Sequence, residues 1–283
     1  MMKTRVCLLA VLGLVVTMLC GCQPNDEPGA ENAEKSAEAQ QTPPETATVE
    51  SECQLDVGWD PWEPYHYLAA GGQLQGLDIE LIRLAAESAG CDLEFIQGSW
   101  HGLLRLLRAG ELDVMMGATR IPGREEFAIF SEPYRSETFQ LYALDSEAEK
   151  YRDQTLSQLM NDGFRLGVTA GYYYGDAVSD LLENPEFDDQ IFEAAVGELN
   201  FTRLLDLQID GFLEDAFVAA AIARRRLESD RVVALPREVS SGPVTFMFSR
   251  ASVDPAIVER FDEALARLRE SGRHQQLLDR YLE

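Results

Sequence analysis

The sequence predicts an α/β protein of two lobes, in which two mixed, mostly parallel sheets are joined by a two-strand hinge. Strand-like and helix-like segments alternate from Cys53 onward, which favours parallel strands connected by right-handed helical crossovers. The segment 52–283 is large for one domain and suits two lobes of about 100 residues each. Two similar extended segments, 138–144 and 244–248, bracket the second half of this pattern.

These bracketing segments suggest how the chain divides into lobes. If both cross between the lobes, the second lobe is an insertion in the first, with a cleft between them. We therefore expect lobe 1 to comprise 52–141 and 244–283, and lobe 2 to comprise 142–243.

The first half of the chain predicts a β-α-β-α-β unit. Apolar side chains recur at helical spacing after Asp78, which we expect to cap this helix, and Gly90 ends it. The expected elements are the strand 54–58, the helix 78–89, the strand 93–96, the helix 103–108 and the strand 113–116.

The second half predicts a similar alternation. Asp254 and Pro255 supply an N-cap and a first-turn proline for a long helix. The expected elements are the strand 141–144, the helix 155–160, the strand 165–169, the helices 176–182 and 201–207, a strand from 211, the helix 217–226, the strand 244–248, the helix 254–271 and a last helix.

The N-terminal residues are typical of an export signal. Lys3 and Arg5 precede an apolar run, 6–19, that is too short to span a membrane. The segment 19–22 (LCGC) resembles the bacterial lipobox, so we expect 1–21 to be a signal peptide and Cys22 to be lipidated; the alternative is cleavage without a lipid. The Pro-, Ala- and Glu-rich segment 22–51 is expected to be a disordered tether.

The charge of the chain excludes several partners. The formal net charge is −25, and removal of the two positive charges of the signal takes it to −27. The chain has no basic stripe, so we expect no nucleic acid and no attraction to anionic lipid, and membrane attachment must rest on the acyl chains. We expect a monomer.

Two cysteines, Cys53 and Cys91, remain once the signal and Cys22 are set aside. Both directly precede strand-like runs, and neighbouring parallel strands would bring them together as a disulfide; two buried thiols are the alternative. No Cys/His cluster has metal-ligand spacing, because the histidines at 66, 101 and 274 are scattered. We expect neither a metal nor a cofactor.

Several motifs appear in an order that resembles the family 3 periplasmic solute-binding proteins, the amino-acid-binding components of ABC importers. The matching segments are 62–65 (WEPY), 76–81 (GLDIEL), 100–104 (WHGLL), 107–114 (LRAGELDV) and 124–134 (REEFAIFSEPY). The resemblance runs from about Gln54 to Glu283. It implies the two-lobe type II periplasmic-binding-protein fold.

The resemblance assigns Arg124 to the ligand's α-carboxylate, which a planar guanidinium fork matches. It assigns Gly117 to the α-ammonium through its backbone carbonyl and Thr119 to the carboxylate through its hydroxyl. Ile121 departs from the family, which usually has Thr or Ser there. A surface salt bridge with Glu125 or Glu126 is the alternative for Arg124.

Two positions of lobe 2 complete the implied site. The segment 210–215 (DGFLED) resembles a family motif whose last aspartate, here Asp215, pairs with the α-ammonium; the alternative is a plain helix N-cap. The segment 171–173 replaces the family's Gly-Thr-Thr, which ends a strand and opens a helix. Its backbone N–H groups, with Tyr172 and Tyr173, are expected to attract the carboxylate; surface packing of these tyrosines is the alternative.

Trp62 and Trp100 match positions that sandwich the ligand's side chain in the family, with core packing as the alternative. Asp60 and Glu63 lie nearby in the sequence, where either would neutralise a cationic ligand. For Asp60 we expect instead a solvated turn before Pro61.

The resemblance implies capture of a small amino-acid-like molecule in the periplasm by a lipid-anchored protein, and delivery to an ABC permease, without enzymatic activity. A cyclohexadienyl dehydratase-like enzyme is a second possibility, because those enzymes share the fold. A third is a sensory module, which would need a separate signalling partner.

Overall fold

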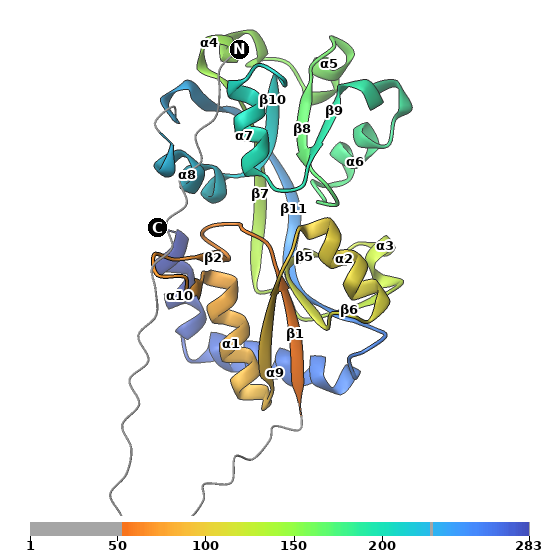
Figure 1. Ribbon diagram of the computed structural model, residues 1–283, viewed down its shortest axis with the longest axis vertical. Coiled ribbons are helices and arrows are strands. Elements are labelled where there is room, and N and C mark those ends of the chain that lie inside the picture. The colour runs from red at the N-terminus through yellow and green to blue at the C-terminus, as the bar shows by residue number, and fades with distance from the viewer. Residues whose placement is uncertain (1–52, 227–228, 283) are drawn as a thin grey trace, which may run out of the picture. The chain divides into compact units, whose positions relative to one another are not determined.

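Two long strands, β7 (Arg135–Leu144) and β11 (Val232–Ser249), run between two groups of elements (Figure 1). The computed structural model describes residues 53–226 and 229–282. The predicted signal peptide, the lipidated Cys22 and the tether lie outside the described residues. We call the lower group in Figure 1 lobe 1 and the upper group lobe 2; the boundaries given above remain a prediction.

Among the described residues, lobe 1 contains four strands of the main sheet, a two-stranded hairpin and five helices, besides its parts of β7 and β11. The strands of the main sheet are β1 (Gln54–Trp59), β4 (Asp92–Gln97), β5 (Val114–Thr119) and β6 (Ala128–Phe130). The helices are α1 (Leu77–Ala89), α2 (Trp100–Ala109), α3 (Pro122–Glu125), α9 (Pro255–Glu270) and α10 (Arg273–Leu282). A separate small hairpin joins β2 (Tyr67–Leu68) and β3 (Leu74–Gln75).

Among the described residues, lobe 2 adds three strands, one of which, β10, pairs with β7. The strands are β8 (Leu166–Thr169), β9 (Ile191–Ala194) and β10 (Gly211–Asp215). The α-helices are α4 (Asp145–Tyr151), α5 (Leu156–Asn161), α6 (Asp176–Leu182), α7 (Glu198–Leu205) and α8 (Ala216–Arg225). The 3-10 helices are η1 (Pro185–Gln190) and η2 (Ser229–Arg231).

The two predicted sheets share their hinge strands, so hydrogen bonding runs through all nine strands in the order β4-β1-β5-β11-β7-β10-β8-β9, with β6 on β11. The pairs β1–β4, β1–β5, β8–β9 and β8–β10 are parallel, as the helical crossovers predict. The pairs that involve β7 and β11 are antiparallel. The α/β fold and the mixed sheet are confirmed. The expectation of mostly parallel strands is wrong for the main sheet, in which four of the eight described pairs are antiparallel because β7 and β11 run against their neighbours.

Helices cover both faces of the lobe 1 sheet. α1, α9 and α10 pack against one another, and α2 packs against β1, β5 and β11. Three consecutive residues of β5 are therefore buried: Val114 and Met116 belong to the main apolar core, whereas Met115 packs with α2 in a second cluster.

The start of α1 differs from the prediction. Its N-cap is Gly76 and no side chain caps it, whereas Asp78 lies in the first turn and is fully buried. Gly76 is required here, because its φ is 134° and a Cβ atom would lie 2.0 Å from the carbonyl oxygen of Tyr65. Asp78 was expected to be the cap and instead forms a buried ion pair with Arg135.

β11 begins twelve residues before the expected strand at Val244. Pro236, Gly242 and Pro243 interrupt the strand pattern in the sequence. The register shifts between Ala234 and Glu238 and between Ser240 and Gly242, which lets the strand continue through these residues.

The predicted disulfide is confirmed. Gln54 pairs with Asp92 in the parallel β1–β4 register, which places the preceding residues Cys53 and Cys91 side by side. They are bonded, with 4.5 Å between their Cα atoms. No helix within 53–226 and 229–282 is both long and apolar enough to span a membrane.

Candidate ligand-binding site

A pocket with about 300 Å³ of empty space, open solvent included, lies where β5, β7 and the loop after β8 meet, and we call it the cavity. It is lined by Asp60, Trp62, His66, Trp100, Gly117, Thr119, Arg124, Glu137, Phe139, Tyr172 and Tyr173. All of the ligand-binding residues expected from the sequence line it except Asp215. That they bind a ligand remains a prediction.

The C-terminal end of β5 brings Gly117 and Thr119 to this cavity. Thr119 pairs with Val244 of β11, which in turn pairs with Arg135 of β7, so these three side chains share one face of the sheet. A register shift opens the β5–β11 ladder beside Gly117, whose φ of 72° favours glycine. A Cβ atom there would lie 3.6 Å from both Nη2 of Arg135 and the ring of Trp62.

Arg124 lies in α3, directly after β5, and its side chain is buried. It donates to the carbonyl oxygens of Thr119 and Gly171, both at 3.0 Å, and lies 5.5 Å from the ring of Trp100. Burial lowers the pKa of Arg124 to about 10, so the side chain stays cationic at neutral pH. The alternative of a surface salt bridge with Glu125 or Glu126 is wrong, because Arg124 is buried and none of the ion pairs among the described residues joins it to either; Glu125 pairs with Arg120 instead.

The ring of Tyr172 enters from lobe 2 between the two tryptophans of lobe 1. Its centroid lies 5.8 Å from Trp62 and 5.6 Å from Trp100, with edge-to-face geometry at both. Its hydroxyl donates to Oδ2 of Asp60 at 3.2 Å. Trp62 and Trp100 thus enclose a side chain of the protein itself, in the place where the sequence predicted a ligand side chain.

The segment 171–175 forms a turn and extended chain, and α6 begins only at Asp176. The expected helix start at 171–173 is therefore wrong; the N–H of Tyr172 donates to the carbonyl of Thr169 instead. Gly171 contributes its carbonyl, which accepts from Arg124 and from Nε1 of Trp100 at 2.9 Å. The hydroxyl of Tyr173 donates to Asp176.

Asp215 ends β10 and is the N-cap of α8. Its Oδ1 accepts from the N–H groups of Phe217 at 2.9 Å and Val218 at 3.1 Å, as the helix-cap alternative predicted. Its carboxylate also accepts from the hydroxyl of Tyr65, at 3.1 Å to Oδ2, across the two lobes. Burial raises the pKa of Asp215, and the charge of Arg135 opposes this shift.

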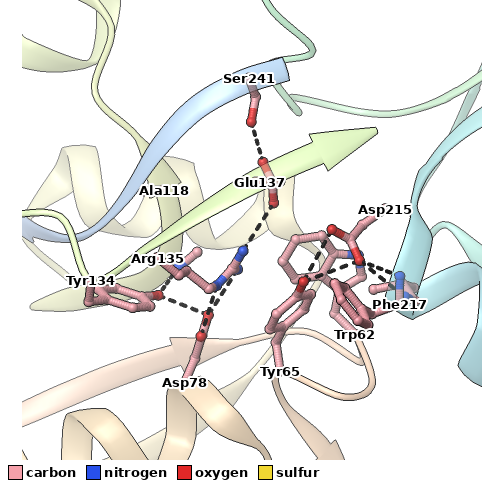
Figure 2. A network of polar contacts seen from close by, with 12 residues as sticks. Trp62, Tyr65, Asp78, Ala118, Tyr134, Arg135, Glu137, Asp215, Phe217 and Ser241 are labelled. Carbon is pink, nitrogen blue, oxygen red and sulfur yellow. Dashed lines mark hydrogen bonds and ion pairs between the residues drawn. The ribbon is translucent and has the colours of Figure 1, made fainter. Parts of the chain in front are cut away.

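A buried polar network on β7 was not expected from the sequence (Figure 2). Arg135 donates to both oxygens of Asp78, at 3.1 and 3.2 Å, and its guanidinium lies 3.8 Å from the ring centroid of Tyr65. Glu137, two residues along, accepts from the hydroxyl of Ser241 at 2.7 Å. Burial raises the pKa of Glu137 to about 7. Charged residues at alternate positions after Pro133 and Tyr134 were the one available signal.

The sequence profile of the bacterial extracellular solute-binding proteins, family 3, matches residues 55–283. The match spans nearly all of the described fold. The chain belongs to this family.

Relatives with named ligands share about a quarter of their residues with this family member. A "Probable histidine-binding protein" of Neisseria gonorrhoeae is 26% identical over 77% of this chain and 78% of that protein. An arginine-binding extracellular protein of Bacillus subtilis is 27% identical over 52% of this chain and 63% of that protein. Among solved structures, an ancestral arginine-binding protein bound to arginine is 20% identical and has a TM-score of 0.70. The match covers 83% of this chain and 100% of the ancestral protein.

In this family member, acidic side chains surround the cavity more closely than the sequence suggested. Asp60 is 1% exposed, so the expected solvated turn is wrong; burial raises its pKa, and His66 lies 3.7 Å from its carboxylate. Glu63 does not line the cavity and pairs with Arg225 of α8. Glu214 accepts from Nε1 of Trp62 at 3.1 Å.

The described residues contain no group of three or more His, Cys, Asp or Glu side chains arranged to hold a metal ion. The polar groups that line the cavity are instead suited to an organic ion. Arg124 offers N–H donors to an anion, and the carboxylates of Asp60 and Glu137 offer acceptors to a cation.

Proposed function

We propose that this chain captures an amino acid in the cavity between its lobes, with a basic amino acid as the first candidate, and delivers it to an ABC permease. One observation carries this proposal. The buried guanidinium of Arg124 and the buried carboxylates of Asp60 and Glu137 line the same aromatic cavity. An α-carboxylate and an α-ammonium would each find an opposite charge there.

Once the two α-groups of the ligand are paired, one carboxylate of the cavity is left without an opposite charge, and a cationic ligand side chain would supply it. One zwitterion supplies one ammonium group, whereas the cavity contains two carboxylates and one arginine. Carboxylates removed from water are stabilised by a cation that replaces their hydration. The names of the histidine- and arginine-binding relatives support the same ligand class.

Closure of the lobes gives the permease a signal to recognise. Gly171 and Tyr172 of lobe 2 contact Arg124 and Asp60 of lobe 1, so a ligand in this cavity touches both lobes only when they are together. Such a ligand stabilises the closed form, because it makes contacts there that it cannot make when the lobes are apart.

A thermal-shift screen with the twenty L-amino acids, followed by isothermal titration, tests ligand capture. A ligand present at 100 times its Kd stabilises the folded protein by about 2.7 kcal/mol. We expect arginine, lysine or histidine to give the largest rise in Tm. If none of the twenty changes Tm, the proposal is contradicted.

Delivery and membrane attachment are tested in cells. Deletion of the gene should abolish uptake of the radiolabelled ligand. We also propose that Cys22 carries a lipid anchor, so Cys22→Ser should release the protein from the membrane fraction while leaving ligand affinity unchanged. Intact uptake after deletion would favour a sensory role with a separate signalling partner.

The dehydratase alternative makes a different prediction. Incubation of the protein with prephenate or arogenate should give no turnover if the chain is a binding protein. Formation of an aromatic product would support the enzyme instead.

A further inference from the structure

We propose that Glu137 on hinge strand β7, and not Asp215, binds the α-ammonium group of the captured amino acid. This inference rests on the proposed function and names the residue that holds one of the ligand's two charged groups.

Glu137 is buried, and only one of its two carboxylate oxygens accepts a hydrogen bond from the described residues. Its side chain lines the cavity and is 4% exposed. Oε2 accepts from Ser241, whereas Oε1 has no hydrogen-bond partner among the described residues. The nearest cation, Nη1 of Arg135, lies 3.7 Å away, beyond hydrogen-bond distance. Buried oxygens of this kind are normally paired, so Oε1 is available to a donor from a ligand.

Asp215 is already occupied by the protein. Two N–H groups of α8 and the hydroxyl of Tyr65 donate to its carboxylate, and its side chain does not line the cavity. Oδ1 holds the N-terminus of α8, and a ligand ammonium at Oδ2 would have to compete with the hydroxyl of Tyr65.

The sheet places Glu137 where the ligand's backbone atoms are expected. Glu137 lies two residues from Arg135 on β7, so it shares the face of the sheet that carries Thr119. The charge of Glu137 also acts on Arg124, whose pKa it raises. In an α-amino acid, the ammonium group and the carboxylate group are both bonded to the same carbon atom, so their charges lie close together. A carboxylate at Arg124 and an ammonium at Glu137 therefore suit one such molecule.

The electrostatics of Glu137 agree with this role. Burial holds its pKa near 7 even though Arg135 favours the ionised form, and Asp78 and Asp215 oppose ionisation. A ligand ammonium would supply the missing positive charge. Binding of the amino acid at pH 6 to 7 should therefore release a proton from Glu137.

The decisive experiment compares two variants with two ligands. Isothermal titration measures the tightest-binding of the twenty L-amino acids and its α-deamino analogue, which keeps the carboxylate and the side chain. In Glu137→Gln, we expect the amino acid to bind at least thirtyfold more weakly and the analogue to change by less than threefold. We call the ratio of these two affinities the preference for the α-amino group, and it should fall by at least about tenfold in this variant. In Asp215→Asn, the matched control, the preference should persist.

A second measurement does not depend on folding of the variants. For the wild-type protein, the ratio of the two affinities should increase between pH 5.5 and 8, because Glu137 ionises in this range. His66 also lines the cavity, but it faces both ligands in the same way, so its contribution cancels in the ratio.

Each outcome is decisive. An unchanged preference in Glu137→Gln, a collapsed preference in Asp215→Asn, or a ratio independent of pH would overturn the assignment of Glu137. Absence of binding by any of the twenty amino acids to the wild type would instead refute the proposed function.

Discussion

Tyr172 of lobe 2 donates its hydroxyl to Oδ2 of Asp60 in lobe 1 over 3.2 Å, inside the candidate ligand cavity. The same ring lies between Trp62 and Trp100. In the proposed mechanism, a long cationic side chain must displace this hydroxyl to reach Asp60. Tyr172 is thus a competitor of the ligand as well as a contact between the lobes.

Tyr172→Phe should strengthen the binding of a basic amino acid. The variant keeps the ring but leaves Asp60 without the hydroxyl, so the ligand no longer competes with it. A hydrogen bond of about 1 kcal/mol corresponds to roughly fivefold in Kd. Isothermal titration with L-arginine, L-lysine and L-histidine measures the change.

The matched control is Tyr142→Phe, because the Tyr142 hydroxyl donates to Gln140 and its side chain does not line the cavity. It should leave Kd unchanged. Weaker binding by Tyr172→Phe would mean that this hydroxyl contacts the ligand directly.

Arg124→Ala should weaken binding on the order of thirtyfold, because loss of one partner of a desolvated charge pair costs about 2 kcal/mol or more. Arg120→Ala is the control, since the Arg120 side chain is exposed and pairs only with Glu125 among the described ion pairs. Titration of both variants with the ligand found in the screen decides this assignment. Equal affinities of Arg124→Ala and wild type would place the carboxylate elsewhere.

Loss of the Cys53–Cys91 disulfide should destabilise the protein by about 4 kcal/mol in the chain-entropy model, given the separation of 38 residues. Urea unfolding of the Cys53→Ala, Cys91→Ala double variant measures the difference. A reducing agent should lower the stability of the wild type to that of the variant. A further loss in the reduced variant would point to another target of reduction.

Stability should decrease as pH rises from about 6 to 9, in part because of Glu214. Burial raises its pKa to about 8, against about 4.5 when unfolded, so the folded state binds the extra proton in this range. Asp215 and Glu137, its acidic neighbours, act in the same direction.

Glu214→Gln mimics the protonated side chain and keeps an acceptor for Trp62. Urea unfolding between pH 6 and 9 should therefore give a flatter dependence for this variant than for the wild type. Parallel curves for the two proteins would show that Glu214 does not titrate in this range.

The position of a site residue could be predicted where the residue lies within a short sequence motif. Arg124 and Thr119 sit within a few residues of the end of β5, so chain connectivity alone brings them to the sheet edge. Asp215 shows the limit of such reasoning. Its sequence context fits both an ammonium ligand and a helix cap, and only the positions of Phe217, Val218 and Tyr65 reveal that the carboxylate is occupied.

By itself, the sequence determined the α/β alternation, the parallel β1–β4 pair with its disulfide, and most of the residues that line the cavity, because each follows from local periodicity or a short motif. The tertiary structure decided which charges meet. Asp78, Arg135, Glu137 and Ser241 come from three distant segments, and Tyr172 reaches Asp60 across the lobes. Burial then sets their charge states, since the cost of removing a carboxylate from water depends on every neighbour that packs around it.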